Sequence, residues 1–321
     1  MRMRLAVSLA FGFAAFTGLT AEPNGHAPPL INFEVVWAAP TNSWPDKLWA
    51  YKVVPQDFAE PVISNLMRIG AFTMKDRTKA PAVFAEKDDK TLFFGELEGN
   101  KKHLAICPSL GWVDYFNHAA ESSGNSAVVG VPDQKRATQL GLQYLRLVGI
   151  DVSQIATKSE TSQLDLHWGS QTSSWMDEKT KKQVTVTNRL TVFFRRRIDG
   201  LNVGGIGLNG GFVVGFGNRE QIVELQIYWR NIMPYRLHDC ATPAEISDWL
   251  RTGRISLPPQ AGPSDLIRKL TITYAVPFYA TRFGEEPENF VSPKVDIIAI
   301  VENSKGQAPV QFQAAILRPG G

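Results

Sequence analysis

The pattern of apolar and polar positions predicts two stretches of chain in which one helix accompanies several strands. In the first stretch, LWAYKVV (48–54) has the character of a strand, and apolar residues then recur at helical spacing from Phe58 to Ile69, before Gly70. AVFAEK, TLFFGEL and HLAICPSLGWVDYF follow, and the turn sequence EGNKK joins the last two. We therefore expect the order β-α-β-β-β.

The second stretch begins with the most regular helical pattern in the chain. Pro132-Asp133 opens it, an apolar stripe runs from Ala137 to Val148, and Gly149 ends it. A second helix is expected after Thr242, because Pro243 and Glu245 complete a capping sequence. Strands are expected at LDLHW (164–168), VTVTNRLTVFFRRRI (184–198), FVVGF (212–216), IVELQIYWR (222–230), LTITYAVPFYA (270–280), VDIIAIV (295–301) and VQFQAAIL (310–317). The polar segment SSWMDEKTKKQ is expected to be a loop.

These patterns predict an α+β protein of two lobes, each with one helix packed on an antiparallel sheet. Residues 22–46, rich in Pro, Asn and Ala, are expected to form an extended arm, and residues 47–125 the first lobe. The small and polar residues 119–131 suit a linker, and residues 132–318 form the second lobe.

The N-terminus has the three parts of a secretory signal peptide. MRMR is basic, LAVSLAFGFAAFTGL is apolar, and small residues precede Glu22, so residues 1–21 are expected to be removed. The alternative is an uncleaved membrane anchor, although the apolar run is short of the about 20 residues that a membrane span needs. We expect an extracytoplasmic protein, periplasmic or secreted, that meets a membrane only through this segment if at all.

Composition and charge exclude little beyond nucleic acid. The chain is 44% hydrophobic and 20% charged, which is ordinary for a globular protein. Its net charge of +3 gives no reason to expect nucleic acid as a partner. Two cysteines, Cys107 and Cys240, could form a disulfide in an oxidising compartment, or they could be two separate buried thiols.

One string, GIGLNG (205–210), matches the glycine pattern of a dinucleotide-binding turn. That turn needs a helix after the glycines, because the N-terminus of the helix holds the pyrophosphate. Here GFVVGFG follows, which has the character of a strand. We therefore expect no cofactor and interpret the segment as a hairpin loop, in which Gly205, Gly207, Gly210 and Gly211 allow close approach of main chains.

Three arginines lie close before this loop. Side chains of a strand alternate between its faces, so Arg195 and Arg197 share one side and could bind a carboxylate or another anion. The alternative is a solvated strand end. We expect the contact region of the protein at Arg195, Arg197 and the glycine loop.

The sequence gives little support for catalysis or metal binding. His238-Asp239-Cys240 places a thiol beside an imidazole, but side chains adjacent in sequence usually diverge. His103, His118 and His167 are isolated, so no zinc site is expected. The acids are scattered, and GEEPEN (284–289) forms one acidic loop. A hydrolase that brings two carboxylates together from distant positions stays open.

Residues 197–230, RIDGLNVGGIGLNGGFVVGFGNREQIVELQIYWR, combine an Asp-Gly turn, a glycine-rich loop and two strands that end in Trp-Arg. This stretch resembles the hairpin of PepSY-like and cystatin-like regulatory modules, as in the YycH/YycI-type extracytoplasmic sensors. The helix PDQKRATQLGLQYLRLVGI is similar to the helix that precedes such hairpins. The resemblance covers residues 132–255 and implies a non-enzymatic binding or regulatory role, and it carries over no catalytic residues.

Together these observations predict a secreted, non-enzymatic protein that recognises a protein or peptide through a sheet face or groove. The alternative function is an extracytoplasmic hydrolase with carboxylates from distant positions. Most aromatic side chains of the second half are expected in the core, whereas a row of them on an exposed sheet face would form a binding surface.

Overall fold

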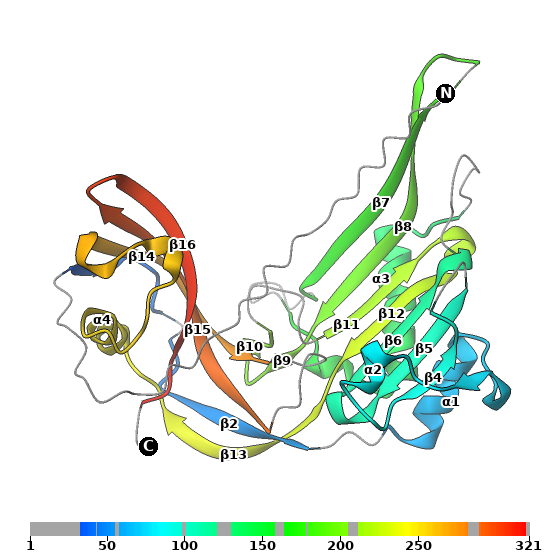
Figure 1. The fold of residues 1–321 in the computed structure, drawn as a ribbon, viewed down its shortest axis with the longest axis horizontal. Coiled ribbons are helices and arrows are strands. Elements are labelled where there is room, and N and C mark those ends of the chain that lie inside the picture. The colour runs from blue at the N-terminus through cyan, green and yellow to red at the C-terminus, as the bar shows by residue number, and fades with distance from the viewer. Residues whose placement is uncertain are drawn as a thin grey trace.

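A computed structural model describes residues 33–42, 44–54, 58–97, 101–120, 130–157, 164–177, 179–204, 211–281 and 289–318 (Figure 1). The expected signal peptide, residues 1–21, lies outside this described part. The described chain is mostly β and forms an eight-stranded sheet and a six-stranded sheet.

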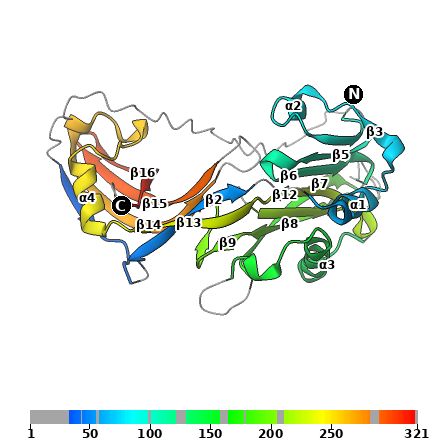
Figure 2. The same cartoon turned by 90° about the horizontal axis from the view of Figure 1, so that it is seen from below.

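The eight-stranded sheet has the strand order β3-β4-β5-β6-β12-β11-β8-β7, and its neighbouring strands are antiparallel. In chain order the strands are β3 (Arg77–Thr78), β4 (Leu92–Gly95), β5 (Lys102–Cys107), β6 (Trp112–Asn117), β7 (Leu166–Met176), β8 (Gln183–Arg195), β11 (Gly211–Phe216) and β12 (Ile222–Tyr228). Helices α1 (Glu60–Ile69) and α3 (Gln134–Leu147) pack on one face, and the short helix α2 (Ala82–Ala85) packs on the other. Figure 2 shows α2 and α3 on opposite sides of the sheet.

The core under α3 follows from the alternation of side chains along the strands. Leu190, Val192 and Phe194 of β8 are buried with the apolar stripe of α3. Gly141 lies in that stripe, and a Cβ atom there would come within 2.6 Å of the Phe194 ring. The glycine is therefore required by close packing of the helix on the sheet.

The six-stranded sheet curls into a half-barrel around helix α4 (Pro243–Arg251). Its order is β1-β14-β15-β2-β13, and β16 pairs with the remaining length of β15. The strands are β1 (Glu34–Trp37), β2 (Lys47–Val54), β13 (Asn231–Asp239), β14 (Ile267–Ala280), β15 (Phe290–Asn303) and β16 (Gly306–Ala315). β1 runs parallel to β14, and the other pairs are antiparallel.

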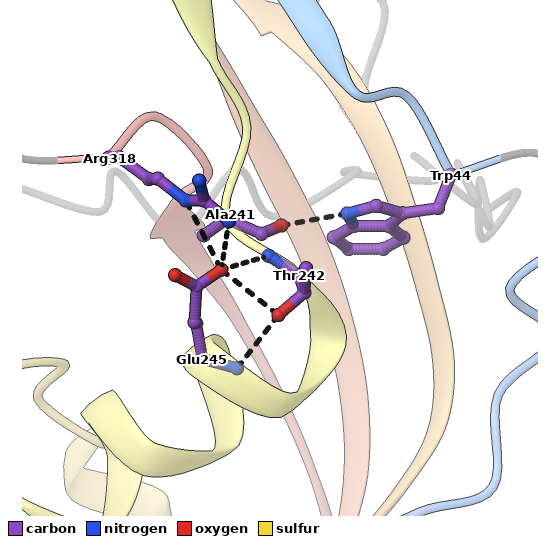
Figure 3. A network of polar contacts seen from close by, with 5 residues as sticks. All are labelled: Trp44, Ala241, Thr242, Glu245 and Arg318. Carbon is purple, nitrogen blue, oxygen red and sulfur yellow. Dashed lines mark hydrogen bonds and ion pairs between the residues drawn. The ribbon is translucent and has the colours of Figure 1, made fainter. Parts of the chain in front are cut away.

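The start of α4 is fixed by polar contacts from three parts of the chain (Figure 3). Glu245 accepts hydrogen bonds from the main-chain N–H of Thr242 (2.7 Å) and from Nη2 of Arg318 (2.9 Å), and the pKa of its carboxyl is held below the usual range mainly by the first of these. The side chain of Thr242 in turn accepts from the N–H of Glu245, which completes the predicted capping box. Trp44 Nε1 donates to the carbonyl of Ala241 at 2.8 Å, so the N-terminal segment is fastened to the same helix end.

The two sheets meet where β12 passes into β13 through Trp229 and Arg230 alone. Both side chains are buried, and Arg230 is only 1% exposed, with its Nε donating to the carbonyl of Leu110 at 2.7 Å. Arg196 lies over the Trp229 ring and donates to the carbonyl of Arg230 at 2.6 Å, and burial lowers its pKa to about 10. The Trp-Arg pair at the end of the expected strand is therefore a buried structural element.

A second contact joins the sheets through the hairpin of β9 (Arg197–Ile198) and β10 (Leu201–Asn202). Asp199 at its turn accepts hydrogen bonds from the hydroxyls of Tyr51 (2.5 Å) and Tyr279 (3.0 Å), which belong to β2 and β14. Both rings are buried in a small core with Ile198 and Val203. The hairpin that extends the eight-stranded sheet is thus bound to the half-barrel.

The expected fold of two lobes, each with one helix on its own sheet, is wrong. The eight-stranded sheet takes strands from both sides of the expected linker at residues 119–131 and carries α1 and α3 on one face. The half-barrel combines β1 and β2 with strands that follow residue 230. Sequence patterns identify elements but do not show which distant strands pair, and here β2 pairs with β13 instead of with its neighbours in sequence.

Individual segments also differ from expectation. Residues 231–239 form β13, although no strand was expected there. Pro234 interrupts the apolar pattern of this segment. Both ends of the expected polar loop SSWMDEKTKKQ belong to strands, since β7 extends to Met176 and β8 begins at Gln183. Part of the expected N-terminal arm is the edge strand β1.

The expected disulfide is not formed. Cys107 lies in the eight-stranded sheet and Cys240 next to the half-barrel, and both are buried free thiols. Their positions in separate cores keep them apart. Burial raises the pKa of each thiol to about 11, so both are uncharged at neutral pH.

Replacing Gly141 by Ala tests the packing of α3. In an exposed helix interior this change stabilises by about 1 kcal/mol. Here we expect destabilisation by about 1–3 kcal/mol, because the added methyl group meets the Phe194 ring. Urea unfolding of the variant measures this, with Gln143→Ala at an exposed position of the same helix as the control. A gain in stability for Gly141→Ala would show that the helix is packed less tightly.

Alkaline titration tests the contact at Asp199. Burial first, and then Asp199, raise the pKa values of Tyr51 and Tyr279 above the usual range. The folded state therefore keeps protons that the unfolded chain loses above about pH 10. We expect the contribution of these groups to the free energy of unfolding to be independent of pH below about pH 10. Above about pH 10 it is expected to fall, by up to about 1.4 kcal/mol per pH unit for each tyrosine.

Urea unfolding between pH 8 and pH 11 measures this slope. Tyr279→Phe is expected to reduce it, whereas Tyr235→Phe, at a side chain 60% exposed, is expected to leave it unchanged. Equal slopes for the two variants would exclude the contact as a source of alkaline instability.

Candidate functional site

Large apolar side chains are exposed on three neighbouring strands of the half-barrel. Trp49 of β2, Phe290 of β15 and three residues of β13 (Met233, Tyr235, Leu237) are 36%, 46%, 50%, 60% and 45% exposed, respectively. We call these five residues the outer patch. β2, β15 and β13 are neighbours in one sheet, so the five side chains gather in one part of the half-barrel.

The register of the strands divides these side chains into two groups, because Trp49 and Lys52 are three residues apart on β2 and point to opposite faces of the sheet. Leu48 is buried in the core with α4, so the next side chain, Trp49, points to the opposite face. Trp49 pairs with Leu237, and Lys52 pairs with both Met233 and Phe290. Directly paired residues of antiparallel strands share a face, with Cβ atoms about 4.5–5.5 Å apart.

A β-bulge in β13 brings Tyr235 into the outer patch. Pro234 pairs with Tyr51 and Arg236 pairs with Ala50, so Tyr235 is an extra residue without a direct partner. Its ring lies 4.9 Å from that of Phe290, centroid to centroid. The bulge thus turns a large aromatic side chain toward the patch.

Two cations border the outer patch. Lys52 and Arg236 are exposed, and neither forms an ion pair with the described part of the chain. Lys47, by contrast, pairs with Asp239 at 3.4 Å at the end of the same strand pair. The surface therefore combines aromatic and aliphatic groups with two cations that no described acidic residue pairs with.

The predicted contact residues Arg195 and Arg197 do not belong to the outer patch, and Arg197 forms hydrogen bonds with other parts of the chain. Arg197 donates from Nε to the carbonyl of Gly200 (2.6 Å) and from Nη1 to Thr157 Oγ1 (3.0 Å). Arg195 ends β8, and its buried Nε has no hydrogen-bond partner among the described residues. The ligand-binding role of Arg195 and Arg197 stays a prediction.

The glycine-rich loop is only partly described. Gly205, Gly207 and Gly210 lie outside the described residues, whereas Gly211 begins β11, where a Cβ atom would come within 2.4 Å of the carbonyl oxygen of Phe194. β11 pairs antiparallel with β8 and β12. The string GIGLNG is therefore followed by a strand, as expected, and not by the helix that a dinucleotide turn requires.

The other predicted motifs do not assemble a reactive site in the described chain. Asp239 pairs with Lys47, and Cys240 is buried behind it. No three His, Cys, Asp or Glu side chains of the described residues are placed to hold a metal ion. Of the helices in that part of the chain, none has the length and apolar character needed to cross a membrane. The acidic loop at residues 285–288 lies outside the described part.

A row of polar side chains crosses the eight-stranded sheet on the face away from α1 and α3. Arg189 of β8 lies 3.5 Å from Glu224 of β12. Asp114 of β6 lies 3.0 Å from Nε2 of His103 and accepts a hydrogen bond from Gln226 at 3.1 Å. Asp114 and Glu224 are diagonal neighbours, because Asp114 pairs directly with Gln226. This row brings two carboxylates together from distant positions, but each of them already contacts other side chains.

Two hollows in the described surface lie away from this row. One, of about 470 Å³, is lined by Val131–Gln134 ahead of α3 and by residues of β7 and β8 that include Trp168 and Thr187. The other lies beside α1 and is lined by residues from Ser64 to Thr73. Neither hollow is lined by Asp114 or Glu224.

Sequence reasoning missed the outer patch because it missed β13. Met233, Tyr235 and Leu237 alternate with other residues as in a strand with one apolar face. Pro234 lies within this segment, and proline is rare inside strands. The tryptophans of the second half do not contribute to the outer patch: Trp229 and Trp249 are buried, as expected for core residues, and the aromatic residues of the patch are Trp49, Tyr235 and Phe290.

Comparisons with known proteins assign no family. No protein-family model matches the chain, and no curated protein matches it. A solved structure similar to this chain is that of an uncharacterized protein from Eubacterium rectale ATCC 33656, which is 9% identical, with 88% of this chain and 86% of that chain covered and a TM-score of 0.43. A similarity of this size carries no argument about function, and the resemblance to PepSY-like modules stays a prediction.

Proposed function

We propose that this chain is an extracytoplasmic, non-enzymatic binding protein that holds a segment of a partner protein on the outer patch. The observation that carries the proposal is the clustering of Trp49, Met233, Tyr235, Leu237 and Phe290 on three adjacent strands. Exposed apolar clusters of this kind mark interaction sites on soluble proteins. The extracytoplasmic location rests on the signal sequence at residues 1–21.

The composition of the patch matches that of protein interfaces. Tyr, Trp, Phe, Met and Arg are the residues enriched there, and Tyr, Trp and Arg dominate the energetics of such interfaces. Burying one such side chain fully contributes about 1.5–3 kcal/mol. Burial of two or three side chains of the patch would therefore contribute several kcal/mol to the binding free energy.

The charges around the patch suggest the chemistry of the partner. Lys52 stands between Met233 and Phe290 in the strand register, and Arg236 follows the bulged Tyr235. A bound segment with apolar residues and one or two carboxylates would pack its apolar residues on the patch and pair its carboxylates with Lys52 and Arg236. We therefore propose an apolar, acidic segment as the ligand.

The segment binds the exposed side chains of the sheet and does not add a strand to its edge. Proline and bulges at an edge strand hinder the addition of another strand, and β13 has both, at Pro234 and Tyr235. The same bulge directs Tyr235 to the face, where it contacts Phe290. Side-chain anchoring is therefore the main contribution to binding.

The hydrolase alternative is less well supported. Its best candidates, Asp114 and Glu224, contact His103, Gln226 and Arg189 and lie outside both hollows. A glycosidase needs its two carboxyl groups free to reach the scissile bond. The polar row is more simply explained as satisfied polar groups on a partly exposed sheet face.

Selection from a random peptide display library on the immobilised protein tests the proposal. We expect enriched peptides to combine apolar residues with Asp or Glu. Tyr235→Ser with Leu237→Ser is expected to weaken their binding at least about 10-fold, because truncating an anchor costs 1 kcal/mol or more. Lys52→Glu is expected to weaken binding most at low salt.

The control is Met74→Ser with Val83→Ser, which removes two side chains of similar exposure (63% and 50%) from the other part of the molecule. This control is expected to bind the selected peptides as the wild type does. Peptides that bind the patch variant equally well would contradict the proposal. Patch-dependent binding to lipid vesicles without peptide binding would indicate a membrane surface instead.

A further inference from the structure

β7 is the terminal strand of the eight-stranded sheet. It pairs along its full length with β8, and no described strand pairs with its other edge. Figure 1 shows β7 and β8 reaching well beyond the other strands of the sheet. Its sequence, LHWGSQTSSWM, contains no Pro, Lys, Arg, Asp or Glu. Such residues are the usual protection of an edge strand against pairing with another chain.

The other terminal strands of the two large sheets carry features that discourage pairing. β13 contains Pro234 and a bulge, and β16 contains Pro309. β1 and β3 have only 4 and 2 residues, and each includes a charged side chain. β7, with 11 residues, is thus distinguished from them by both its length and its neutral sequence.

The outer half of the β7–β8 hairpin does not pair with β11, the next strand of its own sheet. β11 pairs with β8 only from Leu190 to Arg195, so Ser173–Met176 and Gln183–Val186 form a ribbon of two strands. Two-stranded ribbons are marginally stable in water by themselves. Met176 is 60% exposed at the end of this ribbon. A further strand along β7 would stabilise it.

We infer that β7 pairs with β7 of a second copy of this chain, antiparallel and about a two-fold axis at Gln171. This register uses all 11 residues, since Gln171 is the central one. Leu166 then pairs with Met176 of the second copy, His167 with its Trp175, and Trp168 with its Ser174. Leu166 thus meets an apolar side chain and His167 an aromatic one, and no like charges face each other.

The geometry of β7 suits this pairing. The bulge in the hairpin adds Asn188 to β8, as Gln171 pairs with Arg189 and Thr172 pairs with Thr187. β7 itself has no extra residue and keeps regular alternation along its outer edge. A two-fold axis is the commonest symmetry of soluble homo-oligomers. The two eight-stranded sheets then form one continuous sheet.

Site-directed cross-linking tests the register. In the inferred dimer, residue 171 faces its own counterpart across the axis, whereas residue 174 lies roughly 20 Å from its counterpart, six residues along the strand. Gln171→Cys is therefore expected to give a covalent dimer on mild oxidation, and Ser174→Cys is not. Both native thiols are buried and do not interfere.

A charge exchange provides a second test. Sedimentation of the wild-type protein is expected to give twice the mass of one chain at micromolar concentrations. Gln171→Lys and Gln171→Glu, at an exposed position, are each expected to weaken dimerisation about 10-fold or more through like charges on the axis, and an equimolar mixture of the two is expected to restore it. A wild-type protein that stays a single copy at 100 µM, or equal cross-linking of the two cysteine variants, would overturn the inference.

Discussion

The arrangement of the two sheets depends on a small polar junction buried where the chain passes from β12 into β13. Arg230 and Arg196 are 1% and 3% exposed, and burial of such groups is unfavourable unless their hydrogen bonds are supplied. Main-chain carbonyls of Leu110 and Arg230 accept from them, and the Trp229 ring lies against Arg196. The contact of Asp199 with Tyr51 and Tyr279 adds a second attachment. Together they hold the half-barrel and the eight-stranded sheet in one fixed arrangement.

This junction explains why the outer patch stays exposed. β2 and β13 leave the junction with one face on the core of the half-barrel and the other toward solvent, so neither sheet covers Trp49 or Leu237. β7 is the terminal strand of the other sheet and contains no residue of the outer patch. Pairing through β7 therefore leaves both copies of the patch free. A dimer with two identical patches would bind a repeated or oligomeric partner more tightly than one patch does.

The sequence predicted the elements better than their assembly. The capping box at Thr242 and Glu245, the stripe of α3 and the strand after GIGLNG all depend on local spacing, and all three are found. The pairing of β2 with β13 and the shared sheet across residues 119–131 depend on contacts between distant residues, which local patterns do not specify. The candidate site was missed for a related reason: Pro234 argues against a strand, and its acceptance at a bulged edge shows only in the assembled sheet.

We propose that a partner protein binds at the outer patch. Photo-cross-linking tests it most directly, with benzoylphenylalanine in place of Tyr235 and, as the reference, in place of Met74, which is equally exposed but lies outside the patch. In cells that produce the protein, we expect a covalent adduct with another protein from position 235 and none from position 74. No adduct at position 235, or the same adducts from both positions, would contradict it.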